Sequence, residues 1–464
     1  MNNTNNDYLD LSPQKIFYDR VNDAPTIEND ENNADEDDFK ATYRNSLLNS
    51  FLVKLEYFYA YISLLFFADA LSFRSYFLVG EGDAYTGFET PIDPLIGLVR
   101  YAILAFTLLI IVVRFKLIAP LLWRMRLLLL LASLPYLSHY WSDFPEFSSK
   151  FGLFVFGITL VGIYIAGRYS LKEQTELLAW VFGTMLALCL LFIVLLPGSG
   201  IEQGMHAGSW RGVFWHKNNL GTYGALSGIF FCLTAQTETK FRWRKNLYWL
   251  LASLAVLMMV MSTSKTALVV FLVSLVLLLA CYILRWHDTV SIPAFLSLFV
   301  IASGVSLWLI QSFAEVLVIL GKGSTLSSRT DIWSSVYYFV KERPLLGHGY
   351  AGFWVDVGEA RHVWGDLGFE PVHSHNGFLD LILDLGFVGL AVFLVIFILT
   401  YGRLLRLVRR TRNIRMFWPL LFMSMFILFN IAQAQILKVS FNWLIFVIIC
   451  SSTTEYYRQS INHD

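Results

Sequence analysis

Three short polar segments of this chain combine arginine or histidine with hydroxyl and amide side chains. Segment 211–221 reads Arg-Gly-Val-Phe-Trp-His-Lys-Asn-Asn-Leu-Gly, segment 328–333 reads Ser-Arg-Thr-Asp-Ile-Trp, and segment 373–377 reads His-Ser-His-Asn-Gly. Arginine binds phosphate in bidentate fashion and stays charged, so Arg211 and Arg329 suit a diphosphate. Histidine titrates near neutral pH and can act as a general base toward a hydroxyl group.

Together these residue types would suit glycosyl transfer from a lipid-linked diphosphate. The two arginines would stabilise the charge that develops on the leaving diphosphate, and His375 would activate the acceptor hydroxyl. Other polar side chains of these segments are candidates for substrate binding: His216, Lys217, Asn219, His373 and Asn376. The residue types allow this chemistry and do not single it out.

Each candidate also has a structural interpretation that involves no substrate. Arg211 could pair with a carboxylate or reach the lipid headgroups, and Arg329 could be a surface residue at a helix start. His375 could bond to the backbone at the membrane surface. The roles of His216 and Lys217 stay open between substrate contact and the shaping of their loop.

Metal binding is a further alternative for the histidines. His373 and His375 could hold a metal together with His348 or His362, but such a pair without a carboxylate or cysteine partner is weak evidence. The cysteines lie inside or beside apolar runs without paired spacing, which predicts small buried hydrophobic residues and no disulfide framework. They are Cys189, Cys232, Cys281 and Cys450.

The composition indicates a membrane protein. Of 464 residues, 56% are hydrophobic and 15% are charged, whereas about a quarter of a typical soluble protein is charged. The formal net charge is zero, so the total charge indicates no partner. Apolar runs of about 20 residues, enough to cross a ~30 Å hydrocarbon core, predict an all-α polytopic membrane protein with about twelve transmembrane helices. The predicted spans are 51–72, 95–115, 118–139, 151–167, 175–197, 219–237, 246–263, 265–284, 292–312, 377–401, 416–436 and 440–457.

The long segment 313–376, between two apolar runs, is predicted to be one large folded loop outside the membrane. Loops of this length are usually functional or disordered, and the many aromatic residues here argue against disorder. Ser328 and Asp331 fit a capping box at a helix start, and Pro344 would end that helix. Arg329 would then lie in the first turn, where free backbone N–H groups favour an anion.

The distribution of basic residues predicts the orientation. Lysine and arginine gather in the loops after residues 115, 237 and 402, and such loops stay on the cytoplasmic side. Both termini would then be cytoplasmic. The predicted organisation is a disordered acidic cytoplasmic tail at 1–45, transmembrane helices 1–9 at 46–312, a periplasmic lobe at 313–376, and transmembrane helices 10–12 with a short cytoplasmic tail at 377–464.

The three segments resemble motifs of the O-antigen ligase and polymerase superfamily of bacterial cell-surface polysaccharide assembly. Segment 211–221 resembles the first outer-loop signature of that family. Arg329 with Trp333 resembles its second arginine, at the start of a lobe helix. His375 and Asn376 resemble its histidine-asparagine pair before a helix that re-enters the membrane.

A fourth segment extends the resemblance. Trp141-Ser-Asp-Phe-Pro-Glu is similar to a short early-loop signature of the family, and the resemblance covers about residues 95–455. The amino-acid sequence of segment 211–221 is most similar to that of exopolysaccharide polymerases of the succinoglycan type. The resemblance therefore implies a polysaccharide polymerase.

The resemblance implies the substrate, the site and the partners. The donor would be a polyprenyl-diphosphate-linked oligosaccharide at the periplasmic face of the bacterial inner membrane, and catalysis would need no metal or other cofactor. Arg211 and Arg329 would hold the diphosphate, and His375 would activate the acceptor. The partners would be the lipid bilayer and a flippase and chain-length regulator of the same pathway, with no nucleic acid.

Three other functions remain open at this point. An O-antigen-type ligase would use the same donor and a different acceptor. A secondary transporter would also have many spans, but it would more often show internal repeats and broken helices at corresponding positions of two halves. A polysaccharide-binding or sensing membrane protein would need no catalysis.

Overall fold

The computed structural model describes residues 52–71, 93–284, 292–294, 296–301, 304, 327–355, 358–411 and 414–462. The predicted tail 1–45, most of the predicted span 292–312, and residues 313–326 of the predicted lobe lie outside these ranges. The described chain contains no β-strand, and one isolated bridge joins Ile201 to Trp210.

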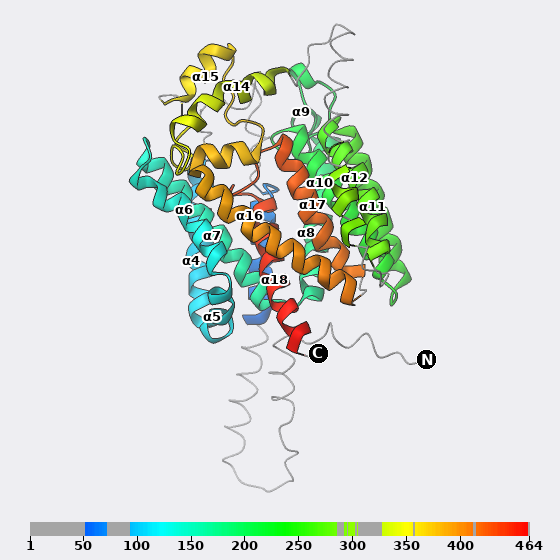
Figure 1. The fold of residues 1–464 in the computed structure, drawn as a ribbon. Helices are drawn as coiled ribbons and strands as arrows, with labels where there is room; N and C mark the ends of the chain where they lie inside the picture. The colour runs from blue at the N-terminus through cyan, green and yellow to red at the C-terminus, as the bar shows by residue number, and fades with distance from the viewer. Residues whose placement is uncertain are drawn as a thin grey trace, which may run out of the picture.

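Helices make up almost all of the described chain, which confirms the predicted all-α class (Figure 1). The first covers residues 52–67. The others, in chain order, are α4 (Asp93–Val113), α5 (Phe115–Arg124), α6 (Arg126–Leu137), η2 (Ser138–Tyr140), α7 (Pro145–Arg168), α8 (Leu171–Leu195), α9 (Pro197–Gly200), η3 (Gly204–His206), α10 (Lys217–Thr237), α11 (Arg242–Met261), α12 (Lys265–Leu284), α14 (Ser327–Glu342), α15 (Ala360–Leu367), α16 (Gly377–Thr411), η4 (Ile414–Met416), α17 (Phe417–Ala432) and α18 (Phe441–Asn462).

The described helices do not confirm the count of about twelve spans. Seven of them are long and apolar enough to cross a membrane, or up to eight if one bent pair is a single span. That pair is α5 with the helix after it, and the chain bends by 83° between them, at Met125. The span predicted at 118–139 is therefore a bent helix pair, either a broken span or a re-entrant loop, and Arg124 and Arg126 flank the bend.

Some predicted spans are described helices that are not among these seven, and the first of them is 51–72, which coincides with the helix at 52–67. The predicted span 219–237 coincides with α10, and 440–457 coincides with α18. Polar residues at both ends of α10, and in the part of α18 that follows Cys450, lower the mean hydropathy of these two helices. Length and apolarity alone therefore underestimate how many helices belong to the bundle.

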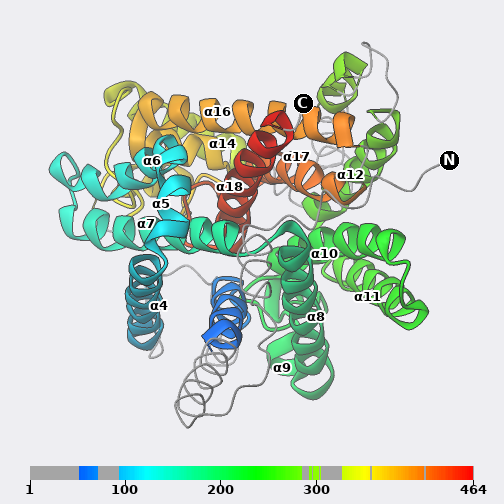
Figure 2. The same cartoon turned by 90° about the horizontal axis from the view of Figure 1, so that it is seen from below.

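The helix α18 lies in the middle of the bundle, between α7 on one side and α16 and α17 on the other (Figure 2). In the apolar stretch of α7, 72% of the residues are buried, whereas in that of α11 only 28% are buried. The exposed residues on the outer helices are largely apolar, such as Val112 and Leu250. A surface of this kind suits contact with lipid chains.

The long helix α16 is broken at Gly386, whose φ of 65° and ψ of −167° are not helical. A Cβ at this position would come within 2.1 Å of the Leu345 carbonyl oxygen. The break exposes backbone groups, and the loop after α14 pairs with them: the amide of Val388 donates to the Leu345 oxygen at 3.2 Å, and the amide of His348 donates to the Leu383 oxygen at 2.7 Å. Only glycine fits at position 386 against the inserted loop, because glycine tolerates this backbone conformation and has no side chain that would clash with the loop.

The early-loop segment around Trp141 anchors the lobe to the bundle. Trp141 Nε1 donates to the Leu346 oxygen at 3.0 Å. The amide of Tyr350 donates to Ser138 Oγ at 2.9 Å, and Ser148 Oγ donates to the Tyr350 oxygen at 2.8 Å. These contacts cross about 200 residues of sequence and position the part of the lobe that leads toward α16.

Ion pairs join helix ends at the side of the bundle opposite α14 and α15 (Figure 1). Glu56 bonds to Arg168 at 2.5 Å and to Arg114 at 2.9 Å. Arg124 at the end of α5 bonds to Glu455 of α18. The basic residues Arg114, Arg124 and Arg168 therefore lie at one end of the molecule.

Candidate active site

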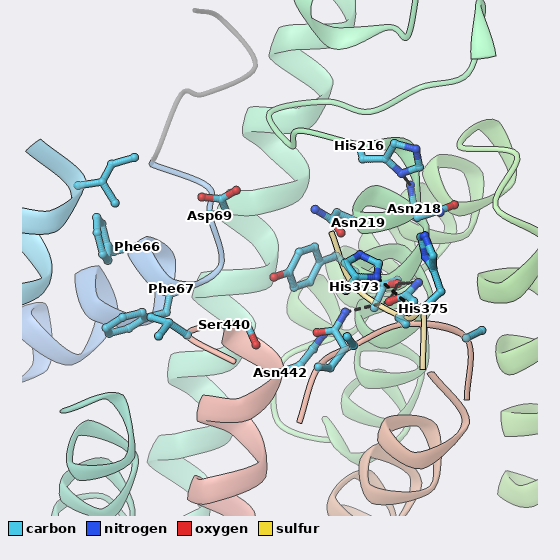
Figure 3. A pocket seen from close by; sticks show the side chains of 18 of the residues that line it. Phe66, Phe67, Asp69, His216, Asn218, Asn219, His373, His375, Ser440 and Asn442 are labelled. Carbon is cyan, nitrogen blue, oxygen red and sulfur yellow. Dashed lines mark hydrogen bonds between the residues drawn. The ribbon is translucent and has the colours of Figure 1, made fainter. Parts of the chain in front are cut away.

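A cavity of ≈ 300 Å³ collects residues from two of the three polar segments. His216 and Asn219 come from the first segment, and His373 and His375 come from the third. Figure 3 shows these side chains grouped on one side, with Phe66 and Phe67 on the other. The remaining lining residues are Asp69, Ile96, Arg100, Asn218, Thr222, Tyr223, Ala432, Gln433, Ala434, Gln435, Val439, Ser440 and Asn442.

The loop that carries the two histidines is held on both sides. Trp333 Nε1 of α14 donates to the Ser374 oxygen at 2.9 Å, and the Ser374 amide donates to Asp380 Oδ1 at 2.9 Å. Asn376 Oδ1 accepts hydrogen bonds of 3.0 and 3.1 Å from two amides in the first turn of α16. Asn376, a candidate for substrate binding, thus caps the helix whose first turn also holds Asp380.

His375 adopts a left-handed backbone conformation with φ of 54°. This region is uncommon for a residue with a side chain, and such strain often occurs at functional sites. The amide of His375 donates to Nδ1 of His373 at 3.1 Å, and the two ring centroids lie 4.1 Å apart. The backbone turn therefore sets the relative position of the two imidazoles.

The electrostatic environment keeps both histidines neutral. Burial, followed by the charges of His373 and Arg329, lowers the pKa of His375 to about 3. Burial, followed by the charges of Lys438 and Arg329, lowers the pKa of His373 to about 4. At neutral pH each ring therefore has an unprotonated nitrogen that can accept a proton.

The first segment enters the cavity through the start of α10. His216 Nδ1 accepts a hydrogen bond of 3.1 Å from the Asn218 amide, and the ring also lines the cavity. Lys217 does not line the cavity, and its Nζ donates to Thr263 Oγ1 at 3.1 Å in the turn between α11 and α12. His216 thus both shapes the loop and borders the cavity, and Asn219, in the first turn of α10, also lines the cavity.

Arg211 holds its own segment together. Its Nε donates to the Ser199 oxygen at 2.7 Å, and its Nη1 lies 3.5 Å from the Trp215 oxygen and 3.7 Å from Glu202 Oε2. Glu202 Oε1 in turn accepts the Lys217 amide at 2.9 Å. The contacts favour the carboxylate-paired interpretation of Arg211, and they show that Glu202, which no motif indicated, organises this loop.

Arg329 lies in the first turn of α14, where the capping pattern predicted it. Burial lowers its pKa, and within the described chain no carboxylate lies at ion-pair distance from it. Arg329 does not line the cavity, but Trp333 at the next turn of α14 bonds to the Ser374 oxygen of the histidine loop. The charge of Arg329 lowers the pKa of both His373 and His375. A half-buried cation without a carboxylate suits an anionic ligand better than Arg211 does.

The structure adds cavity residues that the motifs did not suggest. Arg100 of α4 lines the cavity, with its guanidinium 5.4 Å from the centroid of the Phe154 ring. A charged residue in an apolar run is a signal that could have found it. Gln433 and Gln435 come from the connection between α17 and α18, and Asn442 comes from the first turn of α18. Polar residues between two apolar runs were a weaker signal.

The proposed metal alternative finds no support in the described chain. His348 is buried, with Nε2 3.0 Å from the Phe339 oxygen, and His362 is on α15, with Nε2 3.9 Å from Glu359. Among the residues that the structure describes, no three His, Cys, Asp or Glu side chains are grouped to hold a metal. The four cysteines, all within the described ranges, form no disulfide, and all except Cys232 are buried.

Two comparisons bear on the identity of the chain. Residues 250–394 match the family model described as O-antigen ligase, a range that contains Arg329, His373 and His375. The chain is also 27% identical over 291 residues to the exopolysaccharide production protein ExoQ of Rhizobium meliloti (strain 1021). This similarity covers 59% of the present chain and 64% of that protein, so the chain spans less than two thirds of its relative.

The family match and the apolar helices together identify an integral membrane protein. The matched range covers the second and third polar segments and ends within α16. The predicted resemblance to the O-antigen ligase and polymerase superfamily, of the exopolysaccharide type, is therefore confirmed by both similarities.

Proposed function

We propose that the protein is a glycosyltransferase that polymerises polyprenyl-diphosphate-linked oligosaccharide repeat units into an exopolysaccharide. The observation that carries this proposal is the position of neutral His375 and His373 at one cavity, on a loop that bonds to the helix of the half-buried Arg329. Arg329 has no carboxylate partner in the described chain. A neutral base next to an unpaired cation is the arrangement that glycosyl transfer from a diphosphate needs.

In the proposed reaction, an acceptor hydroxyl attacks the anomeric carbon of the donor sugar. The new glycosidic bond forms as the bond between that carbon and the diphosphate oxygen breaks, and the electron pair leaves with the polyprenyl diphosphate. An imidazole nitrogen of His375 takes the hydroxyl proton. His373 accepts the His375 amide and so positions the base.

Arg329 would bind the diphosphate and stabilise the charge that grows on it. Arg211 would contribute mainly through the loop, since its Nε and Nη1 already contact the Ser199 and Trp215 oxygens. Arg100 lines the cavity from α4 and would supply a further positive charge. The donor lipid would lie beside the apolar outer helices.

An O-antigen-type ligase uses the same donor chemistry, and the description of the matched family favours it as the second candidate. Purified protein should be incubated with lipid-linked repeat unit alone. Growth into a ladder of longer lipid-linked chains supports the polymerase. Transfer that occurs only after a separate acceptor is added indicates a ligase, and uptake of the repeat unit into vesicles without any transfer indicates a transporter.

Catalysis is proposed to be independent of a divalent metal, since arginines supply the positive charge. Chain elongation by purified protein should continue in excess chelator. Loss of elongation that returns when metal is added back contradicts this proposal and revives a metal site at His373 and His375.

The site of action is proposed to be the periplasmic face of the bacterial inner membrane, with both termini in the cytoplasm. A flippase that delivers the donor and a chain-length regulator are the proposed partners. The deletion phenotype separates the candidates in cells: repeat units that stay single indicate a lost polymerase, and long unattached chains indicate a lost ligase.

A further inference from the structure

Four neighbouring side chains form a continuous run of hydrogen bonds along the cavity wall, which we call the amide chain. Asn442 Nδ2 donates to Gln435 Oε1 at 2.7 Å, and Gln435 Nε2 donates to Gln433 Oε1 at 2.8 Å. Gln433 Nε2 donates to Thr222 Oγ1 at 3.2 Å. All four side chains line the cavity, so this part of its wall is polar and uncharged.

The amide chain ends in an atom without a partner. Asn442 is 4% exposed, and its Oδ1 accepts no hydrogen bond within the described chain. Turning the carboxamide over would put Nδ2 in that place, so one polar atom of Asn442 is left over in either orientation. Buried polar atoms are usually paired, and Figure 3 shows Asn442 among the side chains that line the cavity.

The wall is rigid and is joined to the histidine loop. Asn430 is fully buried, and its Oδ1 accepts the amides of Gln435 and Ile436 at 2.8 and 3.1 Å. Its Nδ2 donates to the Phe426 oxygen at 2.7 Å. A Cβ on Gly377 would lie 2.0 Å from the same Oδ1, so Asn430 also abuts the start of α16, directly after the histidines. The distance between the amide chain and His375 is therefore set by packed backbone.

The chemistry of this wall selects its ligand. Neutral amides carry no charge that would neutralise a diphosphate, whereas a hydroxyl group can both donate and accept and so matches the unpaired atom of Asn442 in either orientation. The second N–H of each glutamine amide adds further donors. A cavity of ≈ 300 Å³ is at the lower end of the range for small-molecule sites, which suits a small part of a larger donor.

We propose that the amide chain binds the hydroxyl groups of the sugar that is attached directly to the diphosphate of the donor. Asn442 is a specificity-determining residue in this role, and it orients the anomeric carbon toward His375. The inference rests on the proposed function, because it places the diphosphate beside Arg329 and the first sugar between that residue and α18.

The test compares two probes on the purified full-length protein. They are undecaprenyl diphosphate and the same lipid bearing one hexose on the diphosphate. The wild type should bind the hexose-bearing lipid more tightly, and Asn442→Leu should lower that preference about three- to tenfold, the effect of one or two neutral hydrogen bonds. Binding of the sugar-free lipid should not change, because no charge is altered.

The controls keep the result interpretable. Gln236→Leu removes a partly buried amide of α10 that bonds to Tyr282 and does not line the cavity, so it should leave the preference intact. Gln433→Leu serves as a second variant of the amide chain if Asn442→Leu does not give a monodisperse peak in size-exclusion chromatography. Whichever of Asn442→Leu and Gln433→Leu folds should lose the preference for the hexose-bearing lipid.

The outcomes separate the two proposals. A wild type that binds both lipids equally overturns the sugar site and leaves the diphosphate site standing. A wild type that binds neither lipid overturns the proposed function and the sugar site with it. If Asn442→Leu keeps the preference but weakens binding of a free oligosaccharide, the amide chain holds the acceptor, and the assignment to the donor sugar is wrong.

Discussion

The backbone amide of His375 donates a hydrogen bond to Nδ1 of His373, and His216 accepts the amide of Asn218 through its own Nδ1. An Nδ1 that accepts carries no proton, so in each neutral ring the proton is on Nε2. Two segments separated by more than 150 residues thus bring neutral, backbone-bound histidines to the same cavity. His375, whose own amide makes the first of these bonds, is the histidine best placed to exchange a proton.

Binding of pyrophosphate should raise the pKa of His375. Burial and the charges of His373 and Arg329 lower that pKa to about 3. An anion nearby favours the protonated imidazole and shifts a pKa by about 1–3 units. Because the neutral ring is the active base, activity should fall as the pH drops through the raised value. Histidine NMR titrations with and without inorganic pyrophosphate measure the shift.

His362 provides the internal control for this titration. It is largely exposed on α15 and does not line the cavity, so its signals should not respond to pyrophosphate. Arg329→Ala alone should also raise the pKa of His375, because the arginine lowers it. A pKa of His375 that stays unchanged by pyrophosphate would show that the anion binds elsewhere.

The backbone at His375 predicts a difference between two inactive variants. The left-handed φ of 54° is tolerated by glycine and costs other residues about 1–2 kcal/mol. His375→Gly should therefore unfold at a temperature equal to or higher than His375→Ala, while both lose polymer formation. Thermal unfolding in detergent and chain-elongation assays measure the two properties. If either variant forms polymer as fast as the wild type, His375 does not act as the base in this reaction.

Part of this site could be predicted from the sequence. Residue type and position before a helix were enough to select His375, His373, His216 and Asn219, which do line one cavity. Helix signals also placed Arg329 in the first turn of α14. Such features can be predicted from local sequence because capping and turn geometry depend on nearby residues.

Side-chain direction and long-range contact could not be predicted. The sequence does not show that Arg211 contacts the Ser199 oxygen and Glu202. It also does not show that Asn376 Oδ1 caps α16. The break in α16 depends on a loop that inserts at Gly386 from about 40 residues earlier in the chain. Such features arise from tertiary packing, which hydropathy does not record.

The orientation of the chain predicts which residues an impermeant reagent can reach. Asp366 is exposed on α15, and Lys245 is exposed near the start of α11. In cells with a permeabilised outer membrane, a single cysteine at Asp366→Cys should react with a membrane-impermeant maleimide, and one at Lys245→Cys should react only after lysis. The native cysteines are replaced first. The reverse labelling pattern would contradict both the topology and a periplasmic reaction.

The two arginines should differ when each is replaced by alanine. Arg211 bonds to the Ser199 and Trp215 oxygens, so Arg211→Ala should lower thermal stability as well as activity. Arg329 has no carboxylate partner in the described chain, so Arg329→Ala should leave a stable, membrane-inserted protein. Its turnover should fall about 10²–10³-fold, the typical effect of losing a preorganised charge from a transition state.

Donor affinity measured separately from turnover tests these roles. Arg329→Ala should weaken binding of undecaprenyl diphosphate, whereas His375→Ala should bind it normally and fail in transfer. Arg329→Lys should rescue poorly, because a point charge cannot reproduce the planar, bidentate guanidinium. Lys341→Ala on the same helix is the matched control, since its ammonium stacks on the exposed ring of Tyr337 and should affect neither property. If Arg329→Ala retains donor binding while His375→Ala abolishes it, the diphosphate lies at the histidine loop, and the division of labour proposed for this site is reversed.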